Sequence, residues 1–122
     1  ANILQLNNDS KMYNYALQEI IFVPNMTQKS NDDDGAILFV YKNGMCRLCG
    51  IFNILVDNYG ILKKLFSIPY TIKKQHWFSI TSTAGHGTYS CRLDMNGDAY
   101  LWTAEDKLPV SGVYMIDTVF SC

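Results

Sequence analysis

Two Asn-Gly dipeptides constrain the fold of this chain more than any other feature. Asn43-Gly44 and Asn96-Gly97 each stand between runs of alternating apolar and polar residues, as in RLDMNGDAYLW at 92–102. Asn-Gly suits a two-residue hairpin turn, because both central residues of a type I′ turn need a positive φ. We therefore expect two β-hairpins, one centred on each dipeptide.

Pairing across a two-residue turn assigns side chains to faces. Around Asn96-Gly97, Leu93 would oppose Tyr100 and Cys91 would oppose Trp102. Successive side chains of a strand point to opposite faces, so this pairing predicts one apolar core face. Its members would be Cys91, Leu93, Met95, Tyr100 and Trp102.

The same pairing around Asn43-Gly44 predicts a second core face. It would contain Ile37, Phe39, Tyr41, Cys46, Leu48, Gly50, Phe52 and Ile54. The opposite face, with Leu38, Val40, Lys42, Met45, Arg47, Cys49 and Asn53, is mixed. In the last strand, Tyr114, Ile116, Thr118, Phe120 and Cys122 share one face, and Val113, Met115, Asp117 and Val119 share the other.

Short strands recur along most of the chain, about ten residues apart, with turn residues between them. This spacing predicts an all-β sandwich or barrel. Of the two we expect an antiparallel, jelly-roll-like β-sandwich. Residues 36–122 would form this domain, and residues 1–35 a preceding segment or linker of uncertain structure. Within that segment, 11–23 fits a helix or a strand equally, and 24–35 reads as a loop. Several strands are apolar on both faces, which predicts that the second faces are buried in a homo-oligomer.

Charge and hydropathy argue against two classes of partner. The net charge is −1, and no basic cluster exceeds Lys63-Lys64 or Lys73-Lys74, so we expect no nucleic-acid partner. No run approaches the roughly 18 apolar residues of a membrane span, so we expect no membrane insertion. The opening ANILQLNNDS lacks the pattern of a signal peptide.

Four cysteines, Cys46, Cys49, Cys91 and Cys122, allow three disulfide pairings. Cys46 and Cys49 would point to opposite faces of a strand, which makes them a poor local pair. We expect free buried thiols in a protein that folds in a reducing cytoplasm. CRLCG at 46–50 could be half of a zinc site, but a completing set with His86 and Cys91 is too loosely spaced, and we expect no metal or other cofactor.

Asp94, Asn96 and Asp98 have the D-x-N-x-D spacing of a calcium loop, with Glu105 at the twelfth position. The glycine that such a loop needs at its sixth position is replaced by Ala99. We therefore interpret the stretch as a structural hairpin.

Nothing in the sequence indicates an enzyme. The two histidines, His76 and His86, belong to no recognisable catalytic motif, and no phosphate-binding glycine loop is present. Tyr59, His76, Trp77, Tyr89 and Trp102 could stack on sugar rings, but the predicted pairing assigns Trp102 to the core. Asn8 and Asn25 begin N-glycosylation sequons, which matter only in a secreted eukaryotic protein.

In a meander, successive turns alternate between two ends of the sheet. One end would hold Asn43-Gly44, the Pro69 loop and Asn96-Gly97. The other would hold the loops at 32–34, 57–60, 82–87 and 104–109. The second end carries most of the long polar loops, where binding residues concentrate.

From residue 36 onward the chain resembles the head domains that end bacteriophage tail-fibre and baseplate proteins. The matching segments are VYKNG (40–44), CRLCGIFNI (46–54), LFSIPY (65–70), CRLDMNGDAYLW (91–102) and VSGVYMIDTVFSC (110–122). The resemblance implies a homotrimer at a fibre tip in the virion, attached to other tail or baseplate proteins, that binds a bacterial surface glycan. The receptor-binding residues would be Asp57, Asn58, Tyr59, His86, Glu105, Asp106 and Lys107.

Two alternatives belong to other classes. One is a secreted trimeric jelly-roll ligand or a carbohydrate-binding module, which the two sequons would suit. The other is a small glycan-degrading enzyme, which would need two carboxylates roughly 5–9 Å apart, such as Asp57 and Glu105.

Overall fold

A computed structural model describes residues 15–55, 62–102 and 110–122. Within these ranges the chain forms ten β-strands and no helix, which confirms the predicted all-β class. The strands are β1 (Tyr15–Gln18), β2 (Ile21–Phe22), β3 (Thr27–Lys29), β4 (Ile37–Tyr41), β5 (Met45–Ile54), β6 (Leu62–Ser67), β7 (His76–Ser82), β8 (Thr88–Leu93), β9 (Asp98–Trp102) and β10 (Gly112–Ser121). In the described ranges there is no helix long and apolar enough to cross a membrane.

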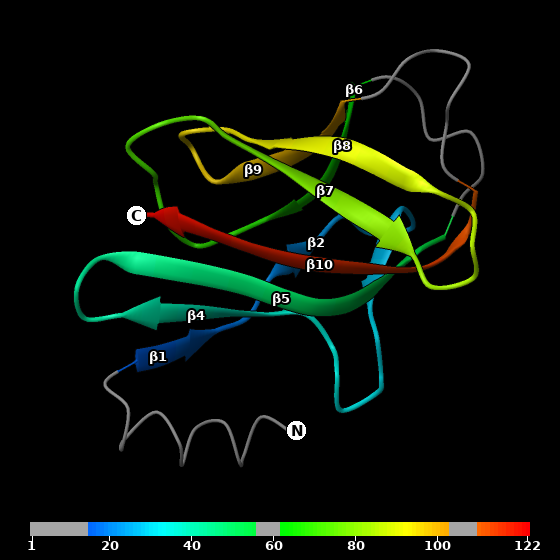
Figure 1. Ribbon diagram of the computed structural model, residues 1–122, viewed down its shortest axis with the longest axis horizontal. Helices are drawn as coiled ribbons and strands as arrows, with labels where there is room; N and C mark the ends of the chain where they lie inside the picture. Colours follow the sequence, from blue (N-terminus) through cyan, green and yellow to red (C-terminus); the bar gives the residue numbers. More distant parts are fainter. Residues whose placement is uncertain (1–14, 56–61, 103–109) are drawn as a thin grey trace.

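The strands join one antiparallel sheet that curls back on itself (Figure 1). Their order is β1-β4-β5-β10-β7-β8-β9-β6-β2, and β3 pairs with β5 beyond the end of β4. The two ten-residue strands β5 and β10 pair along their whole length. By contrast, β10 and β7 pair only from Tyr114 to Ile116, so the two halves of the sheet are joined at one end.

The halves of the sheet enclose the core. Phe52 of β5 and Phe66 of β6 are not on neighbouring strands, yet their ring centroids are 5.9 Å apart. Phe52 also contacts Tyr114 of β10, at 6.5 Å. Thr27 of β3 closes the structure on another side, because its hydroxyl donates to the Leu65 carbonyl of β6. The result is the sandwich-like packing that the strand spacing predicts.

The segment before residue 36, whose structure the sequence left open, adds three short strands to this sheet. β1 pairs with β4, β2 with β6 and β3 with β5. Of the stretch at 11–23 that fitted helix or strand equally, residues 15–18 and 21–22 are strand. Residues 24–35, predicted to be a loop, include β3.

Both predicted hairpins are present, but their turns are one residue longer than expected. Leu93 pairs with Ala99, so the turn is Met95-Asn96-Gly97 with Asp94 and Asp98 on either side. Val40 pairs with Cys46, which leaves Lys42-Asn43-Gly44 as the first turn. Gly44 and Gly97 have φ values of 87° and 93°, as expected for the left-handed residue that ends a three-residue hairpin loop.

The extra residue reverses one face assignment in each hairpin, because a shift of one residue exchanges the faces of a strand. The predicted inward set of β4 was wrong for Phe39 and Tyr41, which are partly exposed and contact Tyr15, whereas Leu38 is fully buried. Ile37, the third member of that set, is buried as predicted. The predicted inward set of β9 was also wrong. Ala99 and Leu101 are buried, and Tyr100 and Trp102 lie on the outer face.

The predicted inward face of β5 and the predicted division of β10 into two faces agree with the structure at most positions. In β5, Cys46, Leu48, Phe52 and Ile54 are buried. In β10, Tyr114, Ile116 and Phe120 are buried, and Met115 and Val119 are exposed on the other side. Large apolar side chains therefore do lie on both faces of β10.

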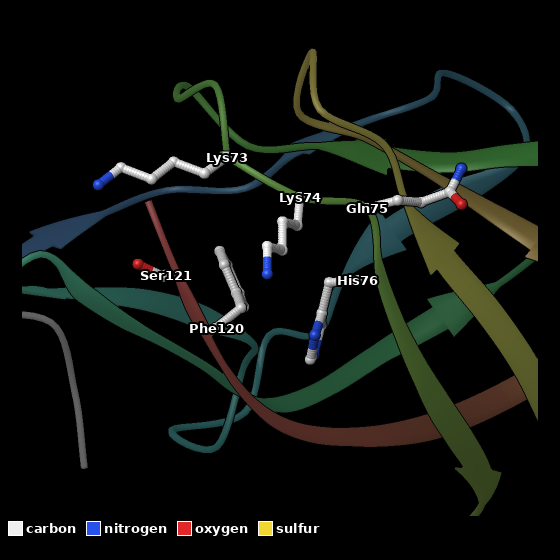
Figure 2. A pocket seen from close by; sticks show the side chains of 6 residues that line it. All are labelled: Lys73, Lys74, Gln75, His76, Phe120 and Ser121. Atoms are coloured by element: carbon white, nitrogen blue, oxygen red, sulfur yellow. The ribbon is translucent and has the colours of Figure 1, made fainter.

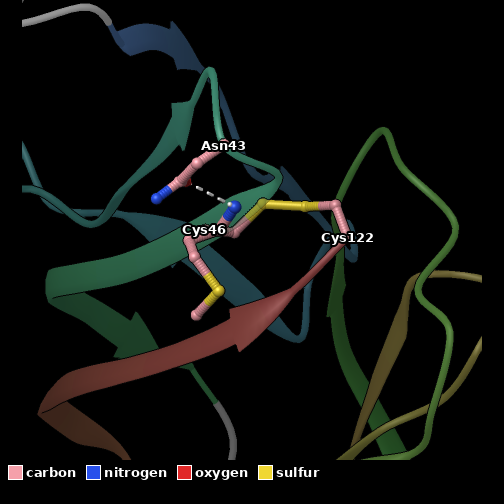
Figure 3. Close-up of a disulfide and its surroundings, with 4 residues drawn as sticks. Asn43, Cys46 and Cys122 are labelled. Atoms are coloured by element: carbon pink, nitrogen blue, oxygen red, sulfur yellow. Dashed lines mark hydrogen bonds between the residues drawn. A yellow bond between two sulfur atoms is a disulfide. The ribbon is translucent and has the colours of Figure 1, made fainter.

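The cysteine prediction was half wrong. Cys46 at the start of β5 and Cys122 after β10 form a disulfide, with Cα atoms 6.3 Å apart (Figure 3). Cys49 and Cys91 are free. The pairing of β10 with β5 places Ser121 opposite Met45, so the sheet itself brings the two bonded cysteines together.

Candidate functional site

The loop residues predicted to bind a receptor are almost all beyond what the structure describes. Asp57, Asn58, Tyr59, Glu105, Asp106 and Lys107 lie outside the described residues, as does the carboxylate pair of the enzyme alternative. His86 is described and exposed, and its carbonyl oxygen accepts a hydrogen bond of 2.8 Å from the Tyr89 hydroxyl.

A different group of side chains meets on the outer face of the sheet. We name it the Trp–Arg patch, and it consists of Trp77 on β7, Arg92 on β8, and Tyr100 and Trp102 on β9. The strand register places these residues together, since Arg92 pairs with Trp77 on one side and with Tyr100 on the other. The patch therefore spans three neighbouring strands.

Arg92 is the centre of the patch. Its guanidinium carbon lies 4.7 Å from the ring centroid of Trp102, 5.9 Å from that of Tyr100 and 6.0 Å from that of Trp77. These separations are within the range of cation–π attraction. The two indoles meet edge to face, with centroids 5.8 Å apart.

Two polar side chains fix the position of Arg92. Its Nε lies 2.8 Å from Oδ1 of Asp94, and a terminal nitrogen donates to Oδ2 of the same carboxylate at 3.3 Å. Asp94 in turn accepts a hydrogen bond of 2.9 Å from the Gln75 amide. The side chains of Arg92 and Asp94 are only 18% and 26% exposed, which makes this pair less solvated than a typical surface ion pair.

The indoles, in contrast, are open to solvent. Trp77 is 51% exposed and Trp102 is 43% exposed. Large aromatic side chains normally bury most of their surface, and an exposed cluster of them rimmed by polar groups is typical of a binding surface. Indole faces stack on the apolar faces of sugar rings, while the neighbouring amide and charged groups can bond hydroxyls.

Sequence reasoning named Trp77 and Trp102 as possible stacking residues but placed Trp102 in the core. The missing signal was the length of the turn. The sequence Met95-Asn96-Gly97 is compatible with a two-residue Asn-Gly turn and equally with a three-residue turn that ends in glycine. Only the three-residue turn places Tyr100 and Trp102 on the outer face.

The metal-like motifs have structural roles. Asp98 bonds Ser67 and Lys64, Asn96 bonds Asp98, and Asp94 holds Arg92, which confirms the hairpin interpretation of D-x-N-x-D. Cys46 of CRLCG is used in the disulfide. Across the described part of the chain, no three His, Cys, Asp or Glu side chains gather as metal ligands would.

Burial shifts the pKa values of Cys91 and His76. Burial raises the pKa of the Cys91 thiol far above its usual range, so this cysteine is a core side chain and a poor nucleophile. Burial lowers the pKa of His76, whose Nε2 lies 2.6 Å from the Thr118 hydroxyl.

Known proteins give no further guidance. Compared with protein-family models, with curated proteins and with solved structures, the chain has no significant match.

Proposed function

We propose that this chain is the non-catalytic head domain of a bacteriophage tail-fibre or baseplate protein, and that it binds a bacterial surface glycan. The observation that carries the proposal is the Trp–Arg patch: two solvent-exposed indoles on either side of an arginine that the partly buried carboxylate of Asp94 holds in place.

The patch is suited to binding without catalysis. Strands β7, β8 and β9 hold its side chains, so little conformational freedom is lost when a ligand arrives. Aromatic and arginine side chains are also the types that most often dominate binding energies. The chain runs from Trp102 into Glu105–Lys107 and from Asp57–Tyr59 into Leu62, which pairs with Trp102. Six of the seven predicted loop residues are thus within five positions of Leu62 or Trp102 along the chain, and we keep all seven, including His86, in the proposal.

The exposed side of β10 supports the homotrimer. Met115 is 47% exposed and Val119 is 53% exposed on this face, although each is a large apolar side chain. Asp117 lies between them and is paired with Arg47, so this face of a central strand presents two large apolar side chains around one ion pair, a mixture that suits a subunit interface. In this proposal the other partners are tail or baseplate proteins, and the domain functions in the virion.

The disulfide favours a second candidate, a secreted jelly-roll ligand or carbohydrate-binding module. Disulfides persist in oxidising compartments, whereas a phage protein folds in the host cytoplasm and would have to form the Cys46–Cys122 bond after release. Mass spectrometry of the natively produced protein separates the two candidates: glycans on Asn8 or Asn25 would identify a secreted eukaryotic protein.

The test of the proposal is an array of bacterial surface polysaccharides probed with the purified chain. We expect saturable binding to a small subset of the array and no release of sugar from it. Absence of binding to every polysaccharide would contradict glycan recognition, and release of reducing ends would show the enzyme alternative to be correct.

A further inference from the structure

A pocket opens where the two halves of the sheet separate. The pairing of β7 with β10 ends at Ile80 and Ile116, and the first residues of β7 diverge from the last residues of β10. The resulting cavity, of about 430 Å³, is lined by Lys73, Lys74, Gln75, His76, Phe120 and Ser121 (Figure 2). This volume is within the range of small-ligand sites.

Most of the lining surface is apolar, and basic and polar groups stand around an aromatic floor. The rings of His76 and Phe120 lie 5.4 Å apart, and Figure 2 shows the Lys74 side chain directed toward both of them. The Lys73 and Gln75 side chains point away from these rings, and the Gln75 amide donates to Asp94. The pocket therefore offers the Lys74 ammonium and the Ser121 hydroxyl beside the two rings, with Lys73 at its edge and no carboxylate side chain among the lining residues.

The two ammonium groups have no anionic partner in the described ranges. The ion pairs found there join Lys29 to Glu19, Arg47 to Asp117, Lys64 to Asp98 and Arg92 to Asp94. The nearest carboxylate with a bond to the lining is Asp94, which accepts from Gln75, and it is already paired with Arg92. Lys73 and Lys74 are thus uncompensated positive charges at the mouth of a cavity, where they attract an anion.

We infer that this pocket binds the anionic group, carboxylate or phosphate, of an acidic saccharide. Lys74 would pair with the anion through a charge-assisted hydrogen bond, Lys73 would add a second one after its exposed side chain turns inward, and the Phe120 and His76 rings would contact the sugar ring. The inference rests on the proposed glycan-binding function and narrows it to acidic glycans. The Gln75–Asp94–Arg92 chain of hydrogen bonds connects the pocket rim to the Trp–Arg patch, so the two sites flank the first residues of β7.

The test is an NMR titration of the ¹⁵N-labelled chain with sodium glucuronate, glucose 6-phosphate and, as the uncharged probe, glucose. We expect both anions, or one of them, to shift the amide signals of His76, Phe120 and Ser121 saturably, whereas glucose leaves them in place. A response to one anion alone would identify the preferred group. The Lys73→Gln/Lys74→Gln variant should weaken binding at least about tenfold, which is a loss of about 1.4 kcal/mol. Lys63→Gln, which alters an exposed lysine on β6, should stay within about twofold of the wild type.

Three results would overturn the inference: equal shifts with glucose, unchanged affinity in the double lysine variant, or no saturable shift at about 20 mM of either anion, well above a millimolar dissociation constant. Failure here remains distinct from failure of the proposed function. Polysaccharide binding that depends on Trp77 and Trp102 would stand without an acidic-group site, and glucuronate could occupy the pocket of a chain that binds no polysaccharide.

Discussion

The guanidinium of Arg92 lies over the indole of Trp102, with its central carbon 4.7 Å from the ring centroid. This contact exists only because the hairpin that joins β8 to β9 has a three-residue turn. With a two-residue turn, Trp102 would have entered the core opposite Cys91. One residue in a turn therefore decides whether the chain presents an exposed aromatic cluster around Arg92.

The turn glycines differ in what surrounds them, and substitution should expose the difference. A Cβ at Gly97 would lie 2.5 Å from the Tyr70 carbonyl oxygen and 2.7 Å from that of Ile68, whereas a Cβ at Gly44 would meet nothing within 4 Å. Both residues have positive φ. We expect Gly44→Ala to cost about 1 kcal/mol of unfolding free energy from backbone strain, and Gly97→Ala roughly 1–3 kcal/mol more from the clash. Urea denaturation measures both, and equal losses would contradict the described close approach.

The Cys46–Cys122 disulfide should contribute substantially to stability. It links residues 76 positions apart, so it restricts the unfolded chain strongly. We expect Cys122→Ser, or reduction of the wild type, to lower the unfolding free energy by roughly 2–5 kcal/mol. The control is Cys49→Ser, which changes a free and partly buried cysteine. A Cys122→Ser variant that is as stable as this control, with no effect of reductant on the wild type, would show that the bond does not form.

His76 should make the fold less stable in mild acid. Burial lowers its pKa below the usual 6.5, so under about pH 6.5 the unfolded chain takes up a proton that the folded chain does not bind. The unfolding free energy should therefore fall as the pH drops from 7.5 to 5. His76→Gln should flatten this slope, and His86→Gln, a change at an exposed histidine, should leave it as in the wild type. Denaturant titrations across this range test the prediction, and an unaltered slope in His76→Gln would refute it.

The carboxylates act in a lower pH window. Burial alone would raise the pKa of Asp98, but hydrogen bonds from Ser67 and Lys64 outweigh it and lower the value, and the Arg47 hydrogen bond lowers that of Asp117. Their contribution to stability is complete above about pH 5 and is lost as the pH falls through the lowered pKa values. The titration of Asp98 and Asp117 therefore does not affect the slope measured for His76 between pH 7.5 and pH 5.

The exposed Met115 and Val119 side chains of β10 should hold the subunits together. Light scattering of the wild type is expected to give three times 13.9 kDa. Val119→Lys, which places a charge on this face, should shift the mass toward a monomer, while Ile21→Lys on β2 should leave the trimer intact. A wild-type monomer at micromolar concentration would argue against the trimer and against β10 as its interface.

The features of the fold that depend on local sequence pattern were predictable, and those that depend on distant pairing were not. Alternation and turn residues were sufficient for the all-β class, the two hairpins and the division of the β10 side chains between two faces, because these features depend on local pattern. The short strands β1, β2 and β3 depend on pairing with distant partners, which local pattern does not specify. The Cys46–Cys122 pair likewise follows from the β5–β10 register, which joins segments about 70 residues apart.

The candidate site was harder to predict than the fold. The Trp–Arg patch needs the correct turn length as well as the order of β7, β8 and β9. The pocket needs the point at which β7 and β10 stop pairing. Neither quantity has a signature in the sequence, whereas the loop residues selected from the resemblance lie mostly outside the described ranges.

The most direct test of the account is the affinity of three chains for the polysaccharide that binds best on the array. Isothermal titration of the wild type, Trp102→Ala and Ile21→Ala compares an indole of the patch with an apolar residue elsewhere that is even more exposed. The account predicts that Trp102→Ala weakens binding at least about tenfold and that Ile21→Ala changes it less than about twofold. Wild-type affinity in a correctly folded Trp102→Ala chain would contradict the claim that the Trp–Arg patch is the binding surface.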